Sequence, residues 1–492
     1  MPEQPKLFQF DNSYAQLPEK FYHRQRPVPV EQPELVALSS SLASDLRMTE
    51  DGVEPAELAS VLAGNLLPSG ADPLAIAYAG HQFGHFVPQL GDGRAILLGE
   101  VWDTDGVRRD IQLKGSGRTP FSRAGDGRAS LGPVIREYVV SEAMHALGVP
   151  TTRSLAAVTT GEPVYRERPL PGAVLTRVAA SHVRIGTFEY FAARRDVEAI
   201  QRLAEYVVDR HYPDAGKTAD PSLALLETVV DSQAALVAKW MHVGFIHGVM
   251  NTDNMTLSGE TIDYGPCAFL DHYDPMMVFS SIDTYGRYAF QNQPTVAQWN
   301  LARLAETLLL TDGGDAKKRL DAAETLVRSF SDRFSRHWLA GMRRKIGLFS
   351  EQDGDAALID ELLDLMRESE ADFTVTFRCL CEAADGNEEN WLSLFHDREK
   401  SESWGTRWRA RLEQEVSVPD RAAQMRRVNP AVIPRNHRIE EVIEAAVRHG
   451  DYSPMQRLQR VLARPYQEPE GMEEFALPPK PSERVRATFC GT

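Results

Sequence analysis

The chain lacks a long apolar run. No window of its 492 residues offers the roughly 18 consecutive apolar positions that a membrane-spanning helix requires, so we expect no membrane span. The first residues, MPEQPKLFQFDNSYAQLPEKFY, lack the apolar stretch of a signal peptide and carry acidic side chains that transit peptides avoid. These absences predict a cytoplasmic protein with no membrane partner.

Cysteine and positive charge are both scarce. Four cysteines are too few for a disulfide scaffold in a chain of this length, although a redox role for one pair stays open. Cys379 and Cys381 lack the second thiol pair of a zinc site, so we expect them to pack in a core element. With 54 Lys and Arg against 70 Asp and Glu, the net charge of −16 argues against a nucleic-acid partner. Any positive site must therefore be local.

Hydrophobic patterns predict an α+β chain in which a strand-rich lobe precedes a helical one. The length exceeds the roughly 250–300 residues at which single cores stop growing, so more than one folded unit is expected. Two strand pairs are predicted, at 94–103 with 107–117 and at 152–160 with 171–179, and a helix lies between them at 132–149. Further helices are expected at 33–48, 220–248, 297–312, 357–369 and 438–450.

These elements suggest four segments. Residues 1–75 form an N-terminal extension that packs on the first lobe, and residues 76–185 form the strand-rich lobe that binds nucleotide phosphates. Residues 186–466 form the helical lobe with the catalytic and metal-binding loop. Residues 467–492, rich in Pro and Glu, form an extended arm.

The stretch HGVMNTDNMTLSGETIDYG, residues 247–265, has the outline of a protein-kinase catalytic loop. Kinases carry His-Arg-Asp-x-x-x-x-Asn followed by Asp-Phe-Gly, in which the first Asp accepts the substrate proton. Here His247 and Asn254 match, but Val249 stands where that Asp is expected. Since a valine takes no proton, the chain is either an inactive kinase or an enzyme with different chemistry.

Other kinase-like elements precede this loop. Lys114 ends a predicted strand and Glu137 lies on the next helix, which is the order of the Lys–Glu pair that clamps nucleotide phosphates. The insert between them has five glycines and a local charge of +3, which indicates an anion site, with a solvated loop as the alternative. Gly91, Gly93 and Arg94 form a second candidate phosphate contact, although such turns also close ordinary hairpins. Arg177 and Arg184 add two guanidinium groups near the lobe junction, or are ordinary surface arginines.

Oxygen donors are available for a divalent ion. Asn254 and Asp263 are suited to a hard cation that bridges phosphates. Asp253 is the nearest carboxylate that could replace the absent base; it could equally be a second metal ligand or a loop cap. His81 and His85 have the spacing of a helical metal pair, but without a third ligand we favour structural histidines.

Three blocks together resemble the selenoprotein O family, which are kinase-like protein adenylyltransferases also called pseudokinases. They are YAGHQFGHFVPQLGDGRAILLGE, QLKGSGRTPFSRAGDGRASLGPVIRE and HGVMNTDNMTLSGETIDYGP. The resemblance implies a protein-kinase-like two-lobe fold in which ATP binds flipped and AMP passes to Ser, Thr or Tyr hydroxyls of proteins. It implies the base Asp253, the metal ligands Asn254 and Asp263, the partner Glu137, and the ATP contacts Gly91, Gly93, Arg94, Lys114, Asp126, Gly127, Arg177 and Arg184.

The resemblance also extends to the C-terminus. Many eukaryotic family members have selenocysteine there, and the corresponding residue resembles Cys490, with Cys267 as a candidate disulfide partner. The implied cofactors are ATP as substrate with Mg²⁺ or Mn²⁺, and redox proteins are candidate partners beside hydroxyl-bearing protein substrates. An ordinary kinase-type phosphotransferase and a catalytically silent nucleotide-binding module are the competing hypotheses.

Overall fold

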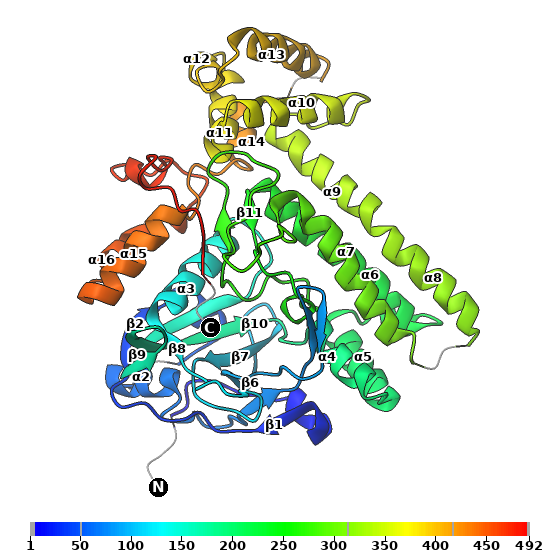
Figure 1. The fold of residues 1–492 in the computed structure, drawn as a ribbon, viewed down its shortest axis with the longest axis vertical. Coiled ribbons are helices and arrows are strands. Elements are labelled where there is room, and N and C mark those ends of the chain that lie inside the picture. Colours follow the sequence, from blue (N-terminus) through cyan, green and yellow to red (C-terminus); the bar gives the residue numbers. More distant parts are fainter. Residues whose placement is uncertain (1–4, 50–51, 312–313, 416–417, 490–492) are drawn as a thin grey trace.

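The computed structural model describes residues 5–49, 52–311, 314–415 and 418–489. Its described part places a sheet at one end of the molecule and most helices beyond it (Figure 1). The eight strands of this sheet are β1 (Tyr22–Arg24), β2 (Glu34–Leu38), β3 (Leu74–Ile76), β6 (Ala95–Trp102), β7 (Arg108–Lys114), β8 (Ala129–Ser130), β9 (Arg153–Tyr165) and β10 (Pro169–Ala179). Their order is β1-β3-β6-β7-β10-β9-β2, with β8 pairing β10, and the pairings are antiparallel.

Both predicted strand pairs are present. β6 and β7 pair from Ala95 opposite Lys114 to Trp102 opposite Arg108, and Gly106 has a φ of +73° in the turn between them. β9 and β10 form the second pair. Because β7 lies between β6 and β10, Lys114 at its end is fixed by a strand on each side.

Helix α3 (Leu131–Ala146) packs on this sheet and confirms the helix predicted at 132–149. Pro133 occupies its first turn, where a missing N–H costs nothing. Gly148, just beyond its end, has a φ of +74°. The helix contacts β9 and β10 and is buried along most of its length, so that even Glu137 is only 4% exposed.

The single helix predicted at 33–48 is wrong in its first half. Residues Glu34–Leu38 form strand β2, and helix α1 covers only Ser40–Asp45. β2 pairs with β9, opposite Thr159 to Ala156, so sheet pairing distant in sequence overrides the local helical pattern. Helix α2 (Pro55–Ala63) follows and packs with α1 over the sheet.

The other predicted helices are confirmed as α6 (Pro221–His242), α7 (Gln293–Leu308), α10 (Asp355–Glu368) and α15 (Asn436–His449). The remaining helices are α4 (Ile185–Ala193), α5 (Val197–His211), α8 (Ala316–Arg328), α9 (Phe330–Lys345), α11 (Phe373–Ala383), α12 (Glu389–Leu392), α13 (Arg398–Glu413), α14 (Arg421–Arg426) and α16 (Ser453–Leu462). Within the described part of the chain, none of the helices has the length and apolar character to cross a membrane.

Buried apolar side chains form three clusters. The largest joins the α3 side of the sheet to α4, α5, α6, α7, α15 and α16. A second fills the helical projection built from α9 to α14, at the top of Figure 1, and contains the buried Cys381 with Cys379 packed against it, as the sequence predicts. The third lies between α1, α2 and the sheet. Residues 467–489 pack along the molecule and include one short helical turn, Glu473–Phe475.

Candidate active site

Four charged side chains meet where the sheet approaches the kinase-like loop. Lys114 Nζ donates to Glu137 Oε2 and to Asp263 Oδ1, each across 2.6 Å. Arg177 on β10 donates to the same two carboxylates, at 2.9 Å from Nε to Glu137 Oε1 and 2.6 Å to Asp263 Oδ1. Burial would raise the pKa of Glu137 and of Asp263, but the Arg177 and Lys114 charges hold both below their usual values. The structure therefore brings together the predicted Lys114–Glu137 pair with both carboxylates ionised.

The sheet register explains why these cations converge. Lys114 lies opposite Leu175 and Arg177 lies opposite Gln112 on the neighbouring strands. Residues two apart on a strand share a face, so Lys114 and Arg177 project from the same side of the sheet. That side faces α3, which supplies Glu137.

The kinase-like loop is held by main-chain contacts. His247 is fully buried, and its Nε2 lies 2.8 Å from the carbonyl oxygen of Ile262, the residue before Asp263. The side-chain amide of Asn254 donates to the carbonyl of Val249 at 2.9 Å. These bonds fix the loop that carries Asn254 against the segment that carries Asp263.

Asp253 is a buried carboxylate at this loop. Its residue is 8% exposed, and its Oδ1 has no hydrogen-bond partner within the described residues. A Cβ on Gly80 would lie 2.7 Å from that oxygen, so Gly80 is required for the close approach of its segment. Burial raises the pKa of Asp253 to about 7, a value suited to a group that exchanges protons near neutral pH.

Arg184 connects Asp253 to the cation cluster. Its guanidinium lies 4.4 Å from the ring centroid of Tyr78 and donates to the carbonyl of Asp253 at 3.1 Å. It also lies 3.7 Å from Asp263 Oδ2 and 4.0 Å from Asp92 Oδ1. Burial raises the pKa of Asp92 to about 6, although Arg184 favours its ionised form. Arg184 is thus held by surrounding groups in one orientation.

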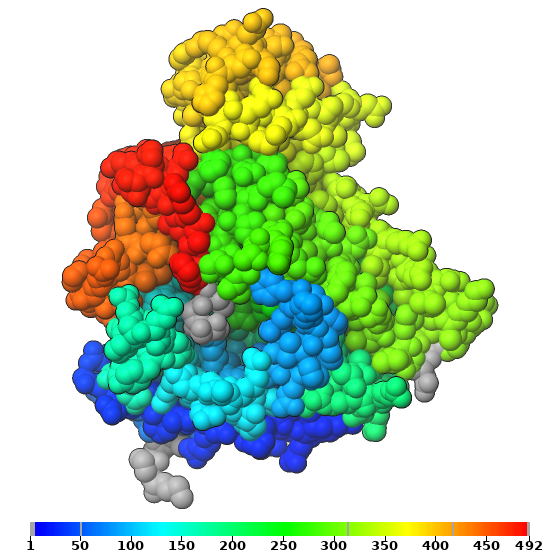
Figure 2. Space-filling model, viewed as in Figure 1, coloured from blue at the N-terminus to red at the C-terminus, as the bar shows by residue number. Residues whose placement is uncertain are grey.

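A cavity of about 360 Å³ lies between these groups. Five cationic residues line it, namely Arg94, Lys114, Arg123, Arg177 and Arg184, against the carboxylates of Asp92, Asp253 and Asp263. Gly93, Val249 and Asn254 also line it. A second hollow, lined by Gly91, Gly93, Arg94 and the segment Phe121–Arg128, continues from it. Figure 2 shows the surface hollowed where the blue and cyan segments meet the green one.

The glycine-rich insert supplies only part of its charge to the cavity. Arg123 lines the cavity, whereas Arg118 donates to the carbonyl of Arg123 and Arg128 donates to the carbonyls of Val28 and Pro29. Asp126 accepts two bonds from Arg166 at 2.8 and 3.2 Å, which orders the insert beside the second hollow.

At two of the predicted nucleotide contacts, Gly91 and Gly127, packing within the protein itself requires glycine. A Cβ on Gly91 would meet the Phe121 ring at 2.3 Å, and a Cβ on Gly127 would meet the backbone of Gly117 at 2.2 Å. Both also have a positive φ, of +72° and +70°, which disfavours other residues. Their glycines are required by packing of the insert, whether or not a ligand approaches.

The residues present fit a hard divalent cation. Asn254 uses its amide nitrogen on Val249, which leaves its oxygen directed to no donor in the described part of the chain. Asp263, at the same cavity, has a φ of +65°, a conformation that costs a non-glycine residue roughly 1–2 kcal/mol and is typical of functional positions. Carboxylate and amide oxygens are preferred by Mg²⁺ and Mn²⁺ over softer ligands. Asn254 and Asp263 would hold such an ion.

Comparisons with known proteins show the family of the chain. Residues 6–463 match the family model described as protein adenylyltransferase SelO. The chain belongs to the SelO family. It is 58% identical over 488 residues to a protein nucleotidyltransferase YdiU of Rhizobium etli (strain CIAT 652), covering 99% of this chain and 97% of that protein. It is 59% identical over 487 residues to the YdiU protein of Bradyrhizobium sp. (strain ORS 278), covering 99% of each.

Several residues of this SelO-family site were not singled out from the sequence. They are Tyr78, Gln82, Asp92 and Asn251, which all line the cavity. Gln82 approaches Asp253 Oδ2 at 3.5 Å, and Asn251 accepts bonds from Phe83 and Tyr288. All four lie in blocks that resemble the family, but nothing local in those blocks indicates their contacts.

His81 and His85, for which we favour structural roles, do not lie on the helix that their spacing suggests. They lie on a short hairpin, β4 (Gly80–Gln82) with β5 (His85–Val87), and not on a helix. His81 pairs with Glu189, and no group of three potential metal-binding side chains occurs among the residues that the structure describes.

The C-terminal arm of this SelO-family chain reaches the site. Thr488 is fully buried, donates its backbone N–H to the Phe279 carbonyl at 2.7 Å and accepts from Ser281 N–H at 3.0 Å. Its hydroxyl donates to the carbonyl of Pro266, the residue before the buried Cys267. Cys490 lies outside the described residues.

Proposed function

We propose that this SelO-family chain transfers AMP from ATP to Ser, Thr or Tyr hydroxyls of proteins and releases pyrophosphate. The observation that carries the proposal is the buried Asp253 carboxylate at a cavity lined by five cationic residues, beside a valine where a kinase has its base. Family membership supports nucleotidyl transfer, and the description of that family as protein adenylyltransferases supports AMP as the transferred group and proteins as the acceptors.

In this mechanism ATP lies reversed, with its β- and γ-phosphates among the cationic side chains Arg94, Lys114, Arg123, Arg177 and Arg184. Asp253 accepts the proton of the acceptor hydroxyl. The hydroxyl oxygen forms a bond to the α-phosphorus while the bond from that phosphorus to the pyrophosphate oxygen breaks. The cationic side chains around the leaving pyrophosphate account for most of the stabilisation of the transition state, because they are already in place and need not reorganise during the reaction.

A bound Mg²⁺ or Mn²⁺ would supply charge neutralisation for the phosphates. Asn254 and Asp263 provide its protein oxygens in this proposal, and Glu137 keeps Lys114 directed at the cavity. Asp126 and Gly127 contact the nucleotide from the second hollow, together with Gly91 and Gly93.

The proposal includes a kinase-like division of the chain. Residues 76–185 form the sheet lobe, 186–466 the helical lobe, and 1–75 and 467–492 the extensions. Support comes from strands β6 to β10, which lie within Ala95–Ala179, and from the helices that follow them. The N-terminal extension adds β1, β2 and most of β3 to the same sheet.

Transfer from ATP labelled separately at the α- and γ-phosphates tests the function. We expect label on protein from the α-position only, dependent on a divalent metal and lost in Asp253→Asn. Label from the γ-position would make the chain a kinase-type phosphotransferase. No label from either position, with ATP still bound, would make it a silent nucleotide-binding module.

A further inference from the structure

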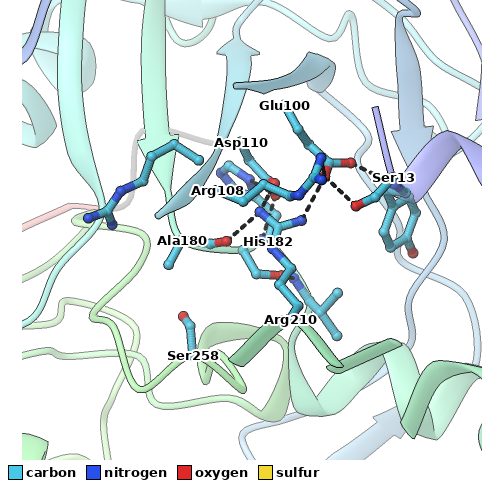
Figure 3. A network of polar contacts seen from close by, with 12 residues as sticks. Ser13, Glu100, Arg108, Asp110, Ala180, His182, Arg210 and Ser258 are labelled. Atoms are coloured by element: carbon cyan, nitrogen blue, oxygen red, sulfur yellow. Dashed lines mark hydrogen bonds and ion pairs between the residues drawn. The ribbon is translucent and has the colours of Figure 1, made fainter. Parts of the chain in front are cut away.

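A buried network of charged side chains joins helix α5 to the sheet (Figure 3). Arg210 on α5 lies 2.5 Å from Asp110 Oδ1 on β7 and 3.1 Å from Glu100 Oε2 on β6. The three side chains are at most 6% exposed. Burial would raise the pKa of Asp110, but Arg210 and the bond from His182 hold it well below its usual value, so Asp110 is ionised.

Asp110 holds His182 twice. The backbone N–H of His182 and its ring Nδ1 both lie 2.9 Å from Asp110 Oδ2. His182 is completely buried, and burial lowers the pKa of its imidazole, so the ring is neutral. Because Asp110 is an ionised acceptor, Nδ1 carries the ring hydrogen. Arg210 adds a bond to the carbonyl of Ala180, at the start of the same loop.

This loop, residues 180–184, delivers Arg184 to the cavity. Arg184 Nε donates to the carbonyl of His182 at 3.2 Å, and NH1 donates to the carbonyl of Asp253 at 3.1 Å. The guanidinium of Arg184 therefore bridges the backbone carbonyls of His182 and Asp253, the residue proposed as the base. A shift of His182 moves one of these two supports.

We propose that His182, anchored by Asp110 and Arg210, is a positioning residue for nucleotidyl transfer and acts through Arg184. The inference rests on the proposed function, in which Arg184 contacts the nucleotide. His182 lines neither hollow of the site, so it does not touch the substrate itself. A histidine that served folding alone would have the same neighbours, and the two roles differ in whether the effect depends on Arg184.

The test is a double-mutant cycle with α-labelled ATP. His182→Phe removes the ring donor at similar size, and His182→Asn keeps a donor near the Nδ1 position. We expect His182→Phe to lower kcat/KM by about tenfold or more, chiefly through KM for ATP, and His182→Asn to restore most of it. In an Arg184→Gln background His182→Phe should change kcat/KM by less than about twofold, because residues acting through one another are not additive.

The outcomes separate the inference from the proposed function. An equal loss from His182→Phe with and without Arg184 would overturn the positioning role while leaving the nucleotide contact intact. An Arg184→Gln variant with unchanged kcat/KM would overturn the proposed contact itself, and the inference with it. If His182→Phe does not fold, Asp110→Asn enters the same cycle with the same expectations.

Arg411→Met serves as the stability control. It breaks the buried ion pair between Arg411 on α13 and Asp355 on α10, whose atoms lie 2.7 Å apart in the helical projection. It should lower the melting temperature without changing kcat/KM. A parallel loss of kcat/KM in this control would assign the His182 effect to general stability and overturn the inference.

Discussion

The side-chain amide of Asn254 donates to the backbone carbonyl of Val249 across 2.9 Å. The valine at the position of the kinase base therefore supports the loop that carries Asn254 through its main chain, and it also lines the cavity. Val249 is only 8% exposed, so a charged side chain at this position would have little contact with solvent.

Val249→Asp should not create a kinase. The new carboxylate would be desolvated in the cavity that Asp253 also lines, and Asp253 Oδ1 already has no partner in the described residues, so the two like charges would repel. We expect AMP transfer to fall by about tenfold or more with no label from the γ-phosphate. Val249→Asn introduces a side chain of the same size as aspartate without its charge, so it should lose less AMP-transfer activity than Val249→Asp. An equal loss in the two variants would show that the shape of the new side chain, and not its charge, causes the effect. Appearance of γ-label would contradict the prediction.

Lys114→Ala should weaken transfer severely and Asp263→Ala should abolish it. One removes a fixed charge on the phosphates and the other a metal oxygen, and losses of about 10²-fold or more are typical for such groups. Initial rates with α-labelled ATP measure both, and a chelator should reproduce the Asp263→Ala result in the unmodified protein. Lys239→Ala, whose amine contacts the Gly148 carbonyl outside the cavity, is the matched control. Near-normal activity of Asp263→Ala would remove it from the metal site.

Oxidation should link Cys267 to Cys490 and change activity. The arm already lies against the carbonyl next to Cys267 through Thr488, two residues before Cys490. Thiol–disulfide exchange is reversible, so a thiol reductant should reverse the change. Peptide mapping of oxidised protein measures the link. Cys490→Ser should remove the redox response, whereas Cys379→Ser should keep it. Absence of the linked peptide together with activity insensitive to reductant would refute the prediction.

Thr488→Val should lower transfer activity even under reducing conditions. The substitution keeps the shape but leaves the Pro266 carbonyl without its hydroxyl donor, three residues after Asp263. Loss of a buried hydrogen bond costs about 1–3 kcal/mol. We expect the loop that carries Asp263 to shift in response, which would lower the activity. Rates in excess reductant measure it. Thr488→Ser should recover activity, and Thr406→Val, at an exposed hydroxyl on α13, should have no effect.

Stability should fall as the pH drops from about 6.5 towards 4, in part through His242. Burial lowers the pKa of this histidine to about 4, so below about 6.5 the unfolded chain takes up a proton that the folded chain excludes. The unfolding equilibrium constant should rise by up to about tenfold per pH unit from this group. Urea unfolding at several pH values should show a shallower dependence for His242→Gln. Glu260, whose pKa burial raises to about 7, contributes a pH dependence of the opposite sign. Because both proteins contain Glu260, its contribution cancels in the difference between their free energies of unfolding. Parallel curves would contradict the assignment.

Two of the site residues that the sequence predicts, Lys114 and Glu137, are carried by regular elements, whereas Asp253, Asn254 and Asp263 are predicted from the kinase-like motif and lie outside α-helices and strands. Lys114 ends a strand with alternating apolar positions and Glu137 lies on a helix with clear periodicity, so spacing alone places them in order. Their meeting with Asp263 follows from the same order of segments that kinases use.

The contacts that sequence reasoning missed come from irregular segments. Tyr78 and Asp92 approach Arg184 from a stretch whose path is set by a short hairpin and by a hydrogen bond that the Ile76 N–H donates to Asp92 Oδ2. Local pattern carries no information on such contacts between positions about 100 residues apart. The same reason explains the error at Glu34–Leu38, where pairing with β9 decides the conformation.

The chain's first forty residues supply the outermost strand at each end of the sheet, β1 beside β3 and β2 beside β9. A chain truncated to begin at residue 76 would leave the hydrogen-bonding groups of β6 and β9 open along both margins. Uncovered strand margins recruit other chains, so such a fragment would aggregate by strand addition even with its cavity residues intact. The short N-terminal strands therefore replace the longer strands β6 and β9 as the edges of the sheet.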